Sequence, residues 1–256
     1  PFQNNDLPGI MLSNSIRSFV NRWGVKSFKK VLLFTNNDDA YLTAINLIDN
    51  EINCIGIVDT RDNPKNVYPK INVYSGSQVI NAHGNLNLKS VDIINSEGKI
   101  INIECDFLGV SGGWNPNIHI SCHTGVKPEW NDKILAFTPG KKNISTHLEA
   151  AGSANGKFTL SECFNDSEIK TVKILNELKI KPKKYVIPKI KKETFNIDPF
   201  WFVKLGSKRK WIDLQNDVTV KDIEIAYNEN FRSVEHLKRY TTLGMGTDQG
   251  KTSNVT

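Results

Sequence analysis

VLLFTNNDDAYLTAINLIDNEINCIGIVD, residues 31–59, is the stretch that decides the fold of most of this chain. It opens with the apolar run Val31–Phe34, which favours a short buried strand. Apolar residues then recur at helical spacing within Asp38–Asp49, so the pattern predicts a helix there. A second apolar run follows and ends on the acidic residue Asp59. Strand, helix and strand closing on an acidic residue is the layout of a dinucleotide-binding unit.

The turn between the first strand and the helix lacks the glycines that let a pyrophosphate approach the backbone. Thr35 and Asn37 take the first two glycine positions, and Ala40 takes the third. Asn37 can cap the helix, while Asp38 and Asp39 lie in its first turn, where two negative charges would oppose a bound anion. The sequence therefore predicts a Rossmann-like half that binds no dinucleotide at this turn.

Composition and charge narrow the class of protein. The 256 residues are 39% hydrophobic and 23% charged, which is typical of a globular protein with a sizeable core. The net charge of +6 is concentrated in the lysine-rich stretch Lys179–Lys192, which we interpret as a solvated linker rather than a nucleic-acid surface. No apolar run approaches the length of a membrane span, so we expect no membrane partner. A chain that runs from Pro1 to Thr256 without a terminal element is expected to be an internal piece of a longer protein.

The four cysteines are far apart in the sequence and show no metal-binding spacing. They are Cys54, Cys105, Cys122 and Cys163. Cys54 and Cys105 fall in apolar strand contexts, so the sequence predicts buried thiols and a reducing, cytoplasmic compartment.

Further elements follow from periodicity and turn residues. A helix is predicted at Leu12–Trp23, ended by Gly24, and a second at Asn165–Glu177. Strand-like alternation runs through Val67–Val110 and contains a hairpin turning at residues 95–98. The aromatic segment Asp198–Val203 is predicted to be a strand.

Two glycine-rich segments are candidates for a nucleotide site, because small residues let backbone pass close to a ligand. Ser111-Gly112-Gly113-Trp114 resembles the strand-to-turn segment "D-x-x-x-x-A-T-G-x-x-P" of oxidoreductases with two dinucleotide-binding domains. Residues 150–156 resemble the late "G-D-x-x-G" segment of the same proteins, with Gly152, Ser153 and Asn155 as the candidate residues. Ser153 stands where flavin-binding members carry Asp, which fits a pyridine nucleotide or an empty site better than FAD. The alternative is two tight turns without a ligand.

Three histidines raise the possibility of a metal site. His119 and His123 have the spacing of two ligands on one helix face, and His147 lies nearby in the sequence. Residues 118–121 alternate like a strand, however, and no carboxylate follows in register. We therefore interpret these residues as ordinary polar histidines and predict no metal.

The segment 211–256 contains a helix–turn–helix pattern. Thr219 and Asp222 form a capping box that predicts a helix through Tyr227, and Ser233 is placed to cap a second helix through Leu237. The pattern resembles the small [2Fe-2S] modules of the bacterioferritin-associated ferredoxin type. The positions of the four cluster cysteines are taken by Asp213, Gln215, Asp248 and Ser253. Because iron–sulfur clusters are held by thiolates, we predict that the scaffold is kept without its cluster.

Three motifs together resemble one family, the alpha subunit of heterotetrameric sarcosine oxidase. They are FTNNDDAYLTA, SGGWNP and SVEHLKRYTTLGMGTDQGKTSN. The resemblance implies an α/β fold with two dinucleotide-binding (FAD/NAD(P)-binding, Rossmann-like) domains, of which this chain carries a part. It also implies an NAD site on the alpha subunit, FMN at the boundary with the beta subunit, and FAD and tetrahydrofolate elsewhere in a complex with beta, gamma and delta subunits. The reaction implied is oxidation of sarcosine with transfer of electrons to oxygen.

The resemblance also implies domain boundaries and a second set of binding residues. Residues 1–192 would form the Rossmann-like region, with the second dinucleotide domain inserted at about 30–105, and residues 193–256 the small module. Arg239, Thr241, Thr242 and Lys251 are candidates to face FMN or the beta subunit, because cations and hydroxyls suit a phosphate. The alternative is a solvated helix end whose basic residues complement the dipole.

The sequence suggests no catalytic acid, base or nucleophile for amine oxidation. A related opine-type amine oxidase and a non-catalytic scaffold are the alternative interpretations. The positions of the cluster ligands in the C-terminal module carry no cysteine. This argues against the opine-type amine oxidase.

Overall fold

The computed structural model describes residues 1–65, 71–140, 148–182, 188, 190 and 193–255. The described chain forms two compact units, one made of residues 1–112 with 198–256 and the other of residues 113–197. The predicted boundary at Lys192 lies outside the described residues, as do His147 and much of the lysine-rich stretch.

The first unit is built on a five-stranded parallel sheet in the order β1-β8-β2-β3-β4. The strands are β1 (Ile10–Leu12), β2 (Val31–Thr35), β3 (Cys54–Asp59), β4 (Val73–Tyr74) and β8 (Phe107–Ser111). The helices α1 (Ser13–Trp23) and α2 (Asp39–Asp49) cover one face. The stretch 31–59 is thus strand, helix and strand, as its sequence predicts.

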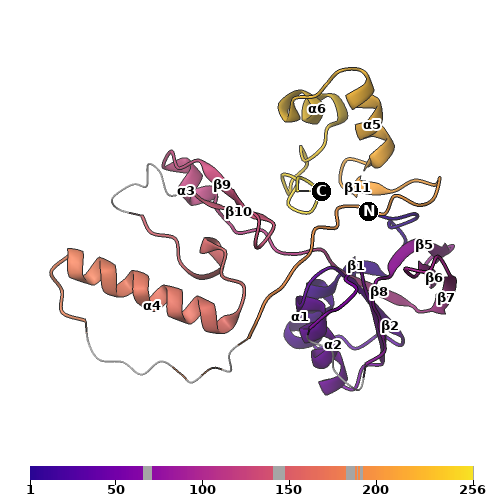
Figure 1. Ribbon diagram of the computed structural model, residues 1–256, viewed down its shortest axis with the longest axis horizontal. Coiled ribbons are helices and arrows are strands. Elements are labelled where there is room, and N and C mark those ends of the chain that lie inside the picture. Colours follow the sequence, from indigo (N-terminus) through magenta and orange to yellow (C-terminus); the bar gives the residue numbers. More distant parts are fainter. Residues whose placement is uncertain (66–70, 141–147, 183–187, 189, 191–192, 256) are drawn as a thin grey trace. The chain divides into compact units, whose positions relative to one another are not determined.

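The other face of this sheet is covered by an antiparallel meander of three strands (Figure 1). It consists of β5 (Gln78–Gly84), β6 (Leu88–Ile94) and β7 (Ile100–Glu104). Leu32 and Phe34 of β2 pack into the core on the meander side, whereas Val31 and Leu33 pack into the core on the helix side. A strand covered on both faces reads as a continuous apolar run, which is why β2 shows no alternation.

Helix α1 approaches the sheet closely at Gly109 in β8. A Cβ atom there would lie 2.6 Å from Leu33 Cδ2 and 2.9 Å from Ile16 Cδ1. A side chain at this position would have to displace the buried ends of Leu33 and Ile16. At its other end, α1 stops at Gly24, whose left-handed conformation (φ 65°) confirms the predicted C-cap.

The second unit is sparse in apolar core. It contains α3 (His119–His123), the hairpin β9 (Pro128–Asn131) and β10 (Ala136–Pro139), a 3-10 turn η1 (Gly152–Asn155) and α4 (Leu160–Glu177). Among its described residues, the buried apolar side chains are Pro116, Val126 and Ala136. Helix α4 begins at Leu160, earlier than predicted, and has no buried residue.

The C-terminal module of the first unit comprises two short strands and two helices. These are β11 (Trp211–Asp213), β12 (Val218–Thr219), α5 (Val220–Asn228) and α6 (Val234–Thr241). The module is tied to the start of the chain by hydrogen bonds of the Asn5 side chain with the Trp211 backbone and of the Gln3 side chain with Lys208 N. Both predicted helices are confirmed, and α6 extends beyond Leu237.

Two predicted elements are wrong. The sequence predicts strand-like alternation at residues 118–121, but His119–His123 is a single helical turn, α3. The segment Asp198–Val203 is irregular rather than a strand, because its backbone binds two separate partners: Asp198 N donates to Asn36 O, and Val203 N donates to Pro1 O.

Candidate nucleotide edge and C-terminal module

The carboxyl ends of β8, β2 and β3 form the edge of the sheet where a dinucleotide fold places its ligand. Ser111, Thr35 and Asp59 lie in one row across these strands, since Thr35 is in register with both of the others. All three residues are buried.

Asn37 fixes the turn that leaves this edge. Its side-chain Nδ2 donates to Ser111 O at 2.9 Å, and its Oδ1 accepts the Ser111 hydroxyl at 3.1 Å. The same Oδ1 accepts the N–H of Asp39 at 3.0 Å, which confirms the capping role predicted for Asn37, although the helix boundary itself falls at Asp38. The predicted site residue Ser111 is therefore engaged within the fold.

A buried ionic cluster fills the space in front of the turn. Arg61 Nη1 lies 2.7 Å from Asp38 Oδ1, and Arg61 Nη2 lies 2.8 Å from Asp59 Oδ2. The Tyr41 hydroxyl donates to Asp59 at 2.9 Å. Side-chain exposure is 6% for Arg61, 5% for Asp38 and 0% for Asp59, so one guanidinium pairs with two carboxylates away from water.

The electrostatics of the cluster follow from this burial. Burial, followed by the neighbouring Asp59 carboxylate, raises the pKa of Tyr41. Burial alone would lower the pKa of Arg61, but hydrogen bonds with Asp59 and Asp38 outweigh it and raise that pKa. Burial also raises the pKa of Asp39, partly offset by its ion pair with Arg17 at 3.1 Å. Asp59, the acidic residue that would hold a ribose in a dinucleotide site, is here bound to Arg61 and Tyr41.

The two glycines that follow Ser111 differ in the space available for a side chain. A Cβ atom added to Gly112 would meet no other atom within 4 Å, so a side chain fits there without a clash. Gly113 has φ +113°, and a Cβ atom on it would lie 2.7 Å from Ile197 Cδ1. Trp114 is partly exposed. Gly112 ends the first unit, and Gly113 and Trp114 begin the second.

In the second unit the candidates Gly152, Ser153 and Asn155 form the 3-10 turn η1. Sequence reasoning missed Asp166 of α4, whose carboxylate accepts Gly152 N at 2.9 Å and Asn155 Nδ2 at 3.2 Å. Ser153 is exposed at the position where the resembling segment has Asp. A carboxylate is thus present at this turn, but it comes from the following helix and holds the turn itself.

The histidine candidates do not gather ligands. His119 and His123 lie on α3, and no group of three or more His, Cys, Asp or Glu residues in the described part of the chain is arranged to hold a metal ion. No helix in the described ranges is long and apolar enough to cross a membrane.

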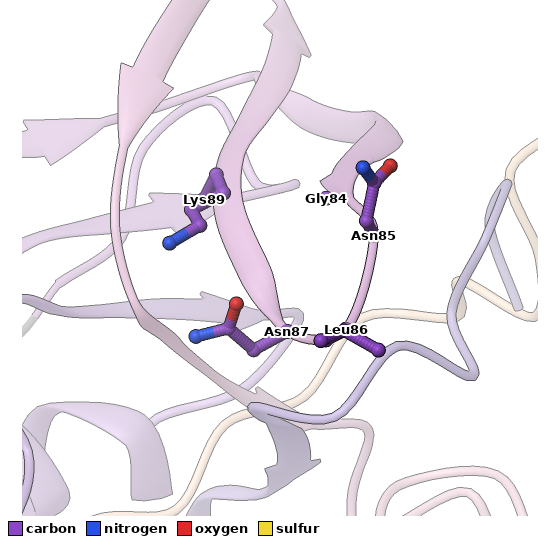
Figure 2. Close-up of a pocket in the computed structure, with 5 residues that line it drawn as sticks. All are labelled: Gly84, Asn85, Leu86, Asn87 and Lys89. Atoms are coloured by element: carbon purple, nitrogen blue, oxygen red, sulfur yellow. The ribbon is translucent and has the colours of Figure 1, made fainter.

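A surface hollow lies at the loop between β5 and β6 (Figure 2), lined by Gly84, Asn85, Leu86, Asn87 and Lys89. It includes none of the residues singled out in the sequence, and Leu86 at its rim is 89% exposed.

In the C-terminal module, the four positions that the sequence resemblance assigns to cluster cysteines carry polar side chains. The Asp213 carboxylate accepts the N–H groups of Gln215 at 2.9 Å and Gly244 at 2.8 Å. Gln215 Oε1 accepts Asp248 N at 3.2 Å, and Asp248 Oδ1 accepts Gly250 N at 3.0 Å. These oxygens point at backbone amides, an arrangement that suits loop closure better than holding iron.

Ser253, the fourth of these positions, is buried. Its hydroxyl has no hydrogen-bond partner in the part of the chain that the structure describes. The sequence could identify the position from its spacing but not the burial of the hydroxyl.

The candidates of the α6 region have different environments. Arg239 is 74% exposed and lies 3.7 Å from Glu235, one turn earlier on α6. Thr241 Oγ1 donates to Leu237 O at 2.8 Å, and Thr242 caps the helix in the left-handed conformation with φ 64°. Lys251 is exposed in the loop that follows, where its N–H donates to Asp248 O. All four candidates belong to the module, and α6 with the loop after it presents charged and hydroxyl groups to solvent.

The first unit has an α/β, Rossmann-like fold built on a parallel sheet. The structure is similar over 99% of this chain to L-proline dehydrogenase from P. horikoshii, with a TM-score of 0.69, 19% identity and 48% coverage of that chain. It is also similar over 66% of this chain to thioredoxin reductase from T. acidophilum, with a TM-score of 0.52, 15% identity and 58% coverage of that chain. The α/β, Rossmann-like part of the predicted fold is thereby confirmed.

The sequence comparisons show which proteins this chain is similar to. The sarcosine oxidase A3 domain matches residues 207–256. The sarcosine oxidase alpha subunit of Rhizobium meliloti (strain 1021) is 33% identical over 258 residues, and that of Corynebacterium sp. (strain U-96) is 32% identical over 273 residues. Each match covers 99% of this chain but only 26% and 28% of those relatives, respectively. The chain is thus similar over nearly its whole length to sarcosine oxidase alpha subunits and corresponds to about a quarter of the length of these relatives.

Proposed function

We propose that this chain serves as part of the alpha subunit of a sarcosine oxidase that oxidises sarcosine to glycine in the cytoplasm. Oxygen is the electron acceptor, and tetrahydrofolate takes the one-carbon unit. The observation that carries the proposal is similarity to sarcosine oxidase alpha subunits over 99% of the chain. The partners are the beta, gamma and delta subunits of the complex.

In this proposal the chain supplies two surfaces and no catalytic residue. The residues after Ser111, Gly112 to Trp114, carry candidate contacts to NAD, and in the second unit the turn Gly152–Asn155 carries further candidates. The turn at Asn37 is not part of the NAD site, because Asp38, Asp59 and Arg61 fill the space in front of α2. NAD would bring the redox chemistry of its nicotinamide, whereas this chain's own residues bind and orient it.

The second surface lies on the C-terminal module and faces FMN and the beta subunit. Arg239 and Lys251 are the cations that would meet the flavin phosphate or an acidic partner surface, and Thr241 and Thr242 lie between them in the sequence. The 74% exposure of Arg239 supports this role, because its guanidinium is open to solvent. The module keeps the scaffold of a [2Fe-2S] domain without its cluster, with the Asp213 and Asp248 carboxylates closing its loops.

The test is the FMN content of the purified complex. Arg239→Ala and Lys251→Ala should each lower FMN retention or assembly while leaving NAD affinity unchanged, because a charge-assisted contact to phosphate is removed. Lys221→Ala, which removes an exposed cation from α5 of the same module, is the matched control and should retain full flavin. Full flavin occupancy and normal assembly in both variants would contradict the proposed flavin-facing surface.

A further inference from the structure

Two loops of the C-terminal module are held together by side chains of one of them. The first loop, residues 213–217, connects β11 to β12, and the second begins at Thr242 after α6. Asp213 Oδ2 accepts Gly244 N at 2.8 Å, and Asn216 Nδ2 donates to Thr242 O at 3.1 Å. Side chains of the first loop therefore form hydrogen bonds with the second loop at the residues on both sides of Leu243.

Asp213 is the centre of this contact. The residue is 3% exposed, and its two carboxylate oxygens accept the backbone N–H groups of Gln215, Asn216 and Gly244. Burial would raise the pKa of Asp213, but these N–H donors outweigh burial and lower it. The carboxylate is therefore held as a buried anion whose charge is balanced by backbone dipoles.

Thr242, whose carbonyl is bound by the first loop, has a strained backbone conformation. Thr242 adopts φ 64° and ψ 12°, the left-handed region that a β-branched residue avoids. Such a conformation persists where the surrounding contacts over-determine it, and it is common at binding sites and switch regions. Here the carbonyl of Thr242 and the amide two residues later are both bound by the Asp213 loop.

Gly246 in the second loop also lies close to the Gln215 side chain of the first loop. A Cβ atom on Gly246 would lie 2.5 Å from Gln215 Oε1, the atom that accepts Asp248 N. The lack of a side chain at Gly246 thus lets the second loop close over the first.

We infer that Asp213 is a positioning residue, which holds the Thr242–Gly244 turn in the strained conformation that the module presents to its ligand. In place of a metal cluster, a single buried carboxylate and the amides around it join the two loops. The positioning of the turn is a property of this chain alone. Its consequence for flavin rests on the proposed function.

The first experiment measures amide hydrogen exchange at Gly244 in the full 256-residue chain. Asp213→Asn keeps the shape of the side chain but turns one acceptor oxygen into a donor that faces N–H groups. Exchange at Gly244 should become faster by about tenfold or more, the loss typical of a hydrogen bond to a charged group. Asp217→Asn is the matched control, because Asp217 is exposed in the same loop and its φ of 55° suits Asn. Equal exchange rates at Gly244 in wild type and Asp213→Asn would overturn the inference.

A suppressor tests whether Asp213 acts through the turn. Thr242→Gly relieves the left-handed strain, so the effect of Asp213→Asn on exchange at Gly244 should be several-fold smaller in the Thr242→Gly background. Asn216→Ala removes the other contact and should also speed exchange at Gly244, which keeps the test decisive if Asp213→Asn fails to fold. Additive effects of Asp213→Asn and Thr242→Gly, or no effect of Asn216→Ala, would show that the turn is not held by this loop.

A measurement of FMN retention distinguishes this inference from the proposed function. In the assembled complex, Asp213→Asn should lower FMN retention, whereas the control Asp217→Asn should leave it unchanged. If exchange at Gly244 changes as stated while FMN retention does not, the positioning stands and the flavin-facing role is contradicted. If Gly244 is unaffected, the positioning itself is wrong, whatever the flavin content.

Discussion

At the scale of single residues, Arg61 explains how an acidic turn is tolerated inside the first unit. Asp38 and Asp59 are buried at the end of the sheet, and one guanidinium contacts both of them. Removing one partner of a buried ion pair leaves an uncompensated charge away from water, which costs far more than an exposed pair contributes. Arg61, which binds both acidic residues at this edge of the sheet, is therefore expected to stabilise the first unit.

We expect Arg61→Met to lower the free energy of unfolding by about 3–5 kcal/mol, the usual cost of breaking a buried ion pair. Urea unfolding of the full chain measures this change. Arg22→Met is the control, because Arg22 is exposed and lies over the Trp23 ring at 5.1 Å. Similar losses of unfolding free energy in the two variants would contradict a stabilising role of the buried cluster.

The cysteines should differ in reactivity toward a thiol reagent at about pH 8. Burial raises the pKa of Cys54 to about 11 and that of Cys105 to about 12, so both remain protonated and weakly nucleophilic. Cys122 is exposed on α3 and should react first. Thiol titration with Cys122→Ser as the reference variant checks this order. Rapid modification of Cys105 in the native chain would contradict it.

Sequence reasoning was partly successful at this scale. It correctly placed Asp38 and Asp39 at the start of α2, and it predicted buried thiols, of which Cys105 is buried and Cys54 half-buried. It did not identify Arg61, because the pair with Asp38 spans 23 residues and depends on how β3 returns beside β2. Asp166 was missed for the same reason, since its partners lie before the start of α4.

At the scale of elements, local signals predicted most boundaries. The helices α1, α2 and α5 and the β6–β7 hairpin lie where periodicity and caps placed them. The segment His119–His123 was misread because a single helical turn is too short to show a period. Residues 198–203 have the composition of a strand, but tertiary hydrogen bonds to Asn36 and Pro1 determine their path.

The two N-caps of the C-terminal module should respond differently to alanine. Thr219 forms a complete capping box with Asp222, so Thr219→Ala should lower the stability of the module by about 1 kcal/mol. Ser233 occupies the N-cap position of α6 but its side chain makes no capping hydrogen bond. Ser233→Ala should therefore have little effect. Denaturant unfolding followed by circular dichroism compares the two, and equal losses would contradict the cap assignment.

At the scale of the whole molecule, the two units differ in how far they bury their apolar residues. The first unit covers both faces of its parallel sheet, with helices on one and the β5–β7 meander on the other, as parallel sheets generally require. In the second unit, α4 exposes apolar side chains at helical spacing, among them Leu160, Phe164 and Ile174. The sequence predicts a helix at Asn165–Glu177, but periodicity alone does not show what covers its apolar side.

The most direct test of this account is the NAD affinity of the full-length protein. Its central claim is that the β2–α2 turn is retained as structure and is not the nucleotide site. Replacement of Gly113 or Gly152 by Val is expected from the sequence to weaken NAD binding, but both positions have positive φ, so either variant also strains its own backbone. Gly112 has no such strain and has open space around it, which makes Gly112→Val the cleaner variant.

Binding should be titrated for wild type, Asn37→Gly and Gly112→Val at a temperature where each variant is folded, since Asn37 is buried and hydrogen-bonded. We expect Asn37→Gly to keep the wild-type Kd for NAD and Gly112→Val to weaken binding several-fold by blocking the approach to the backbone. A several-fold change in Kd for Asn37→Gly, with wild-type affinity in Gly112→Val, would place the nucleotide at the β2–α2 turn and contradict the account.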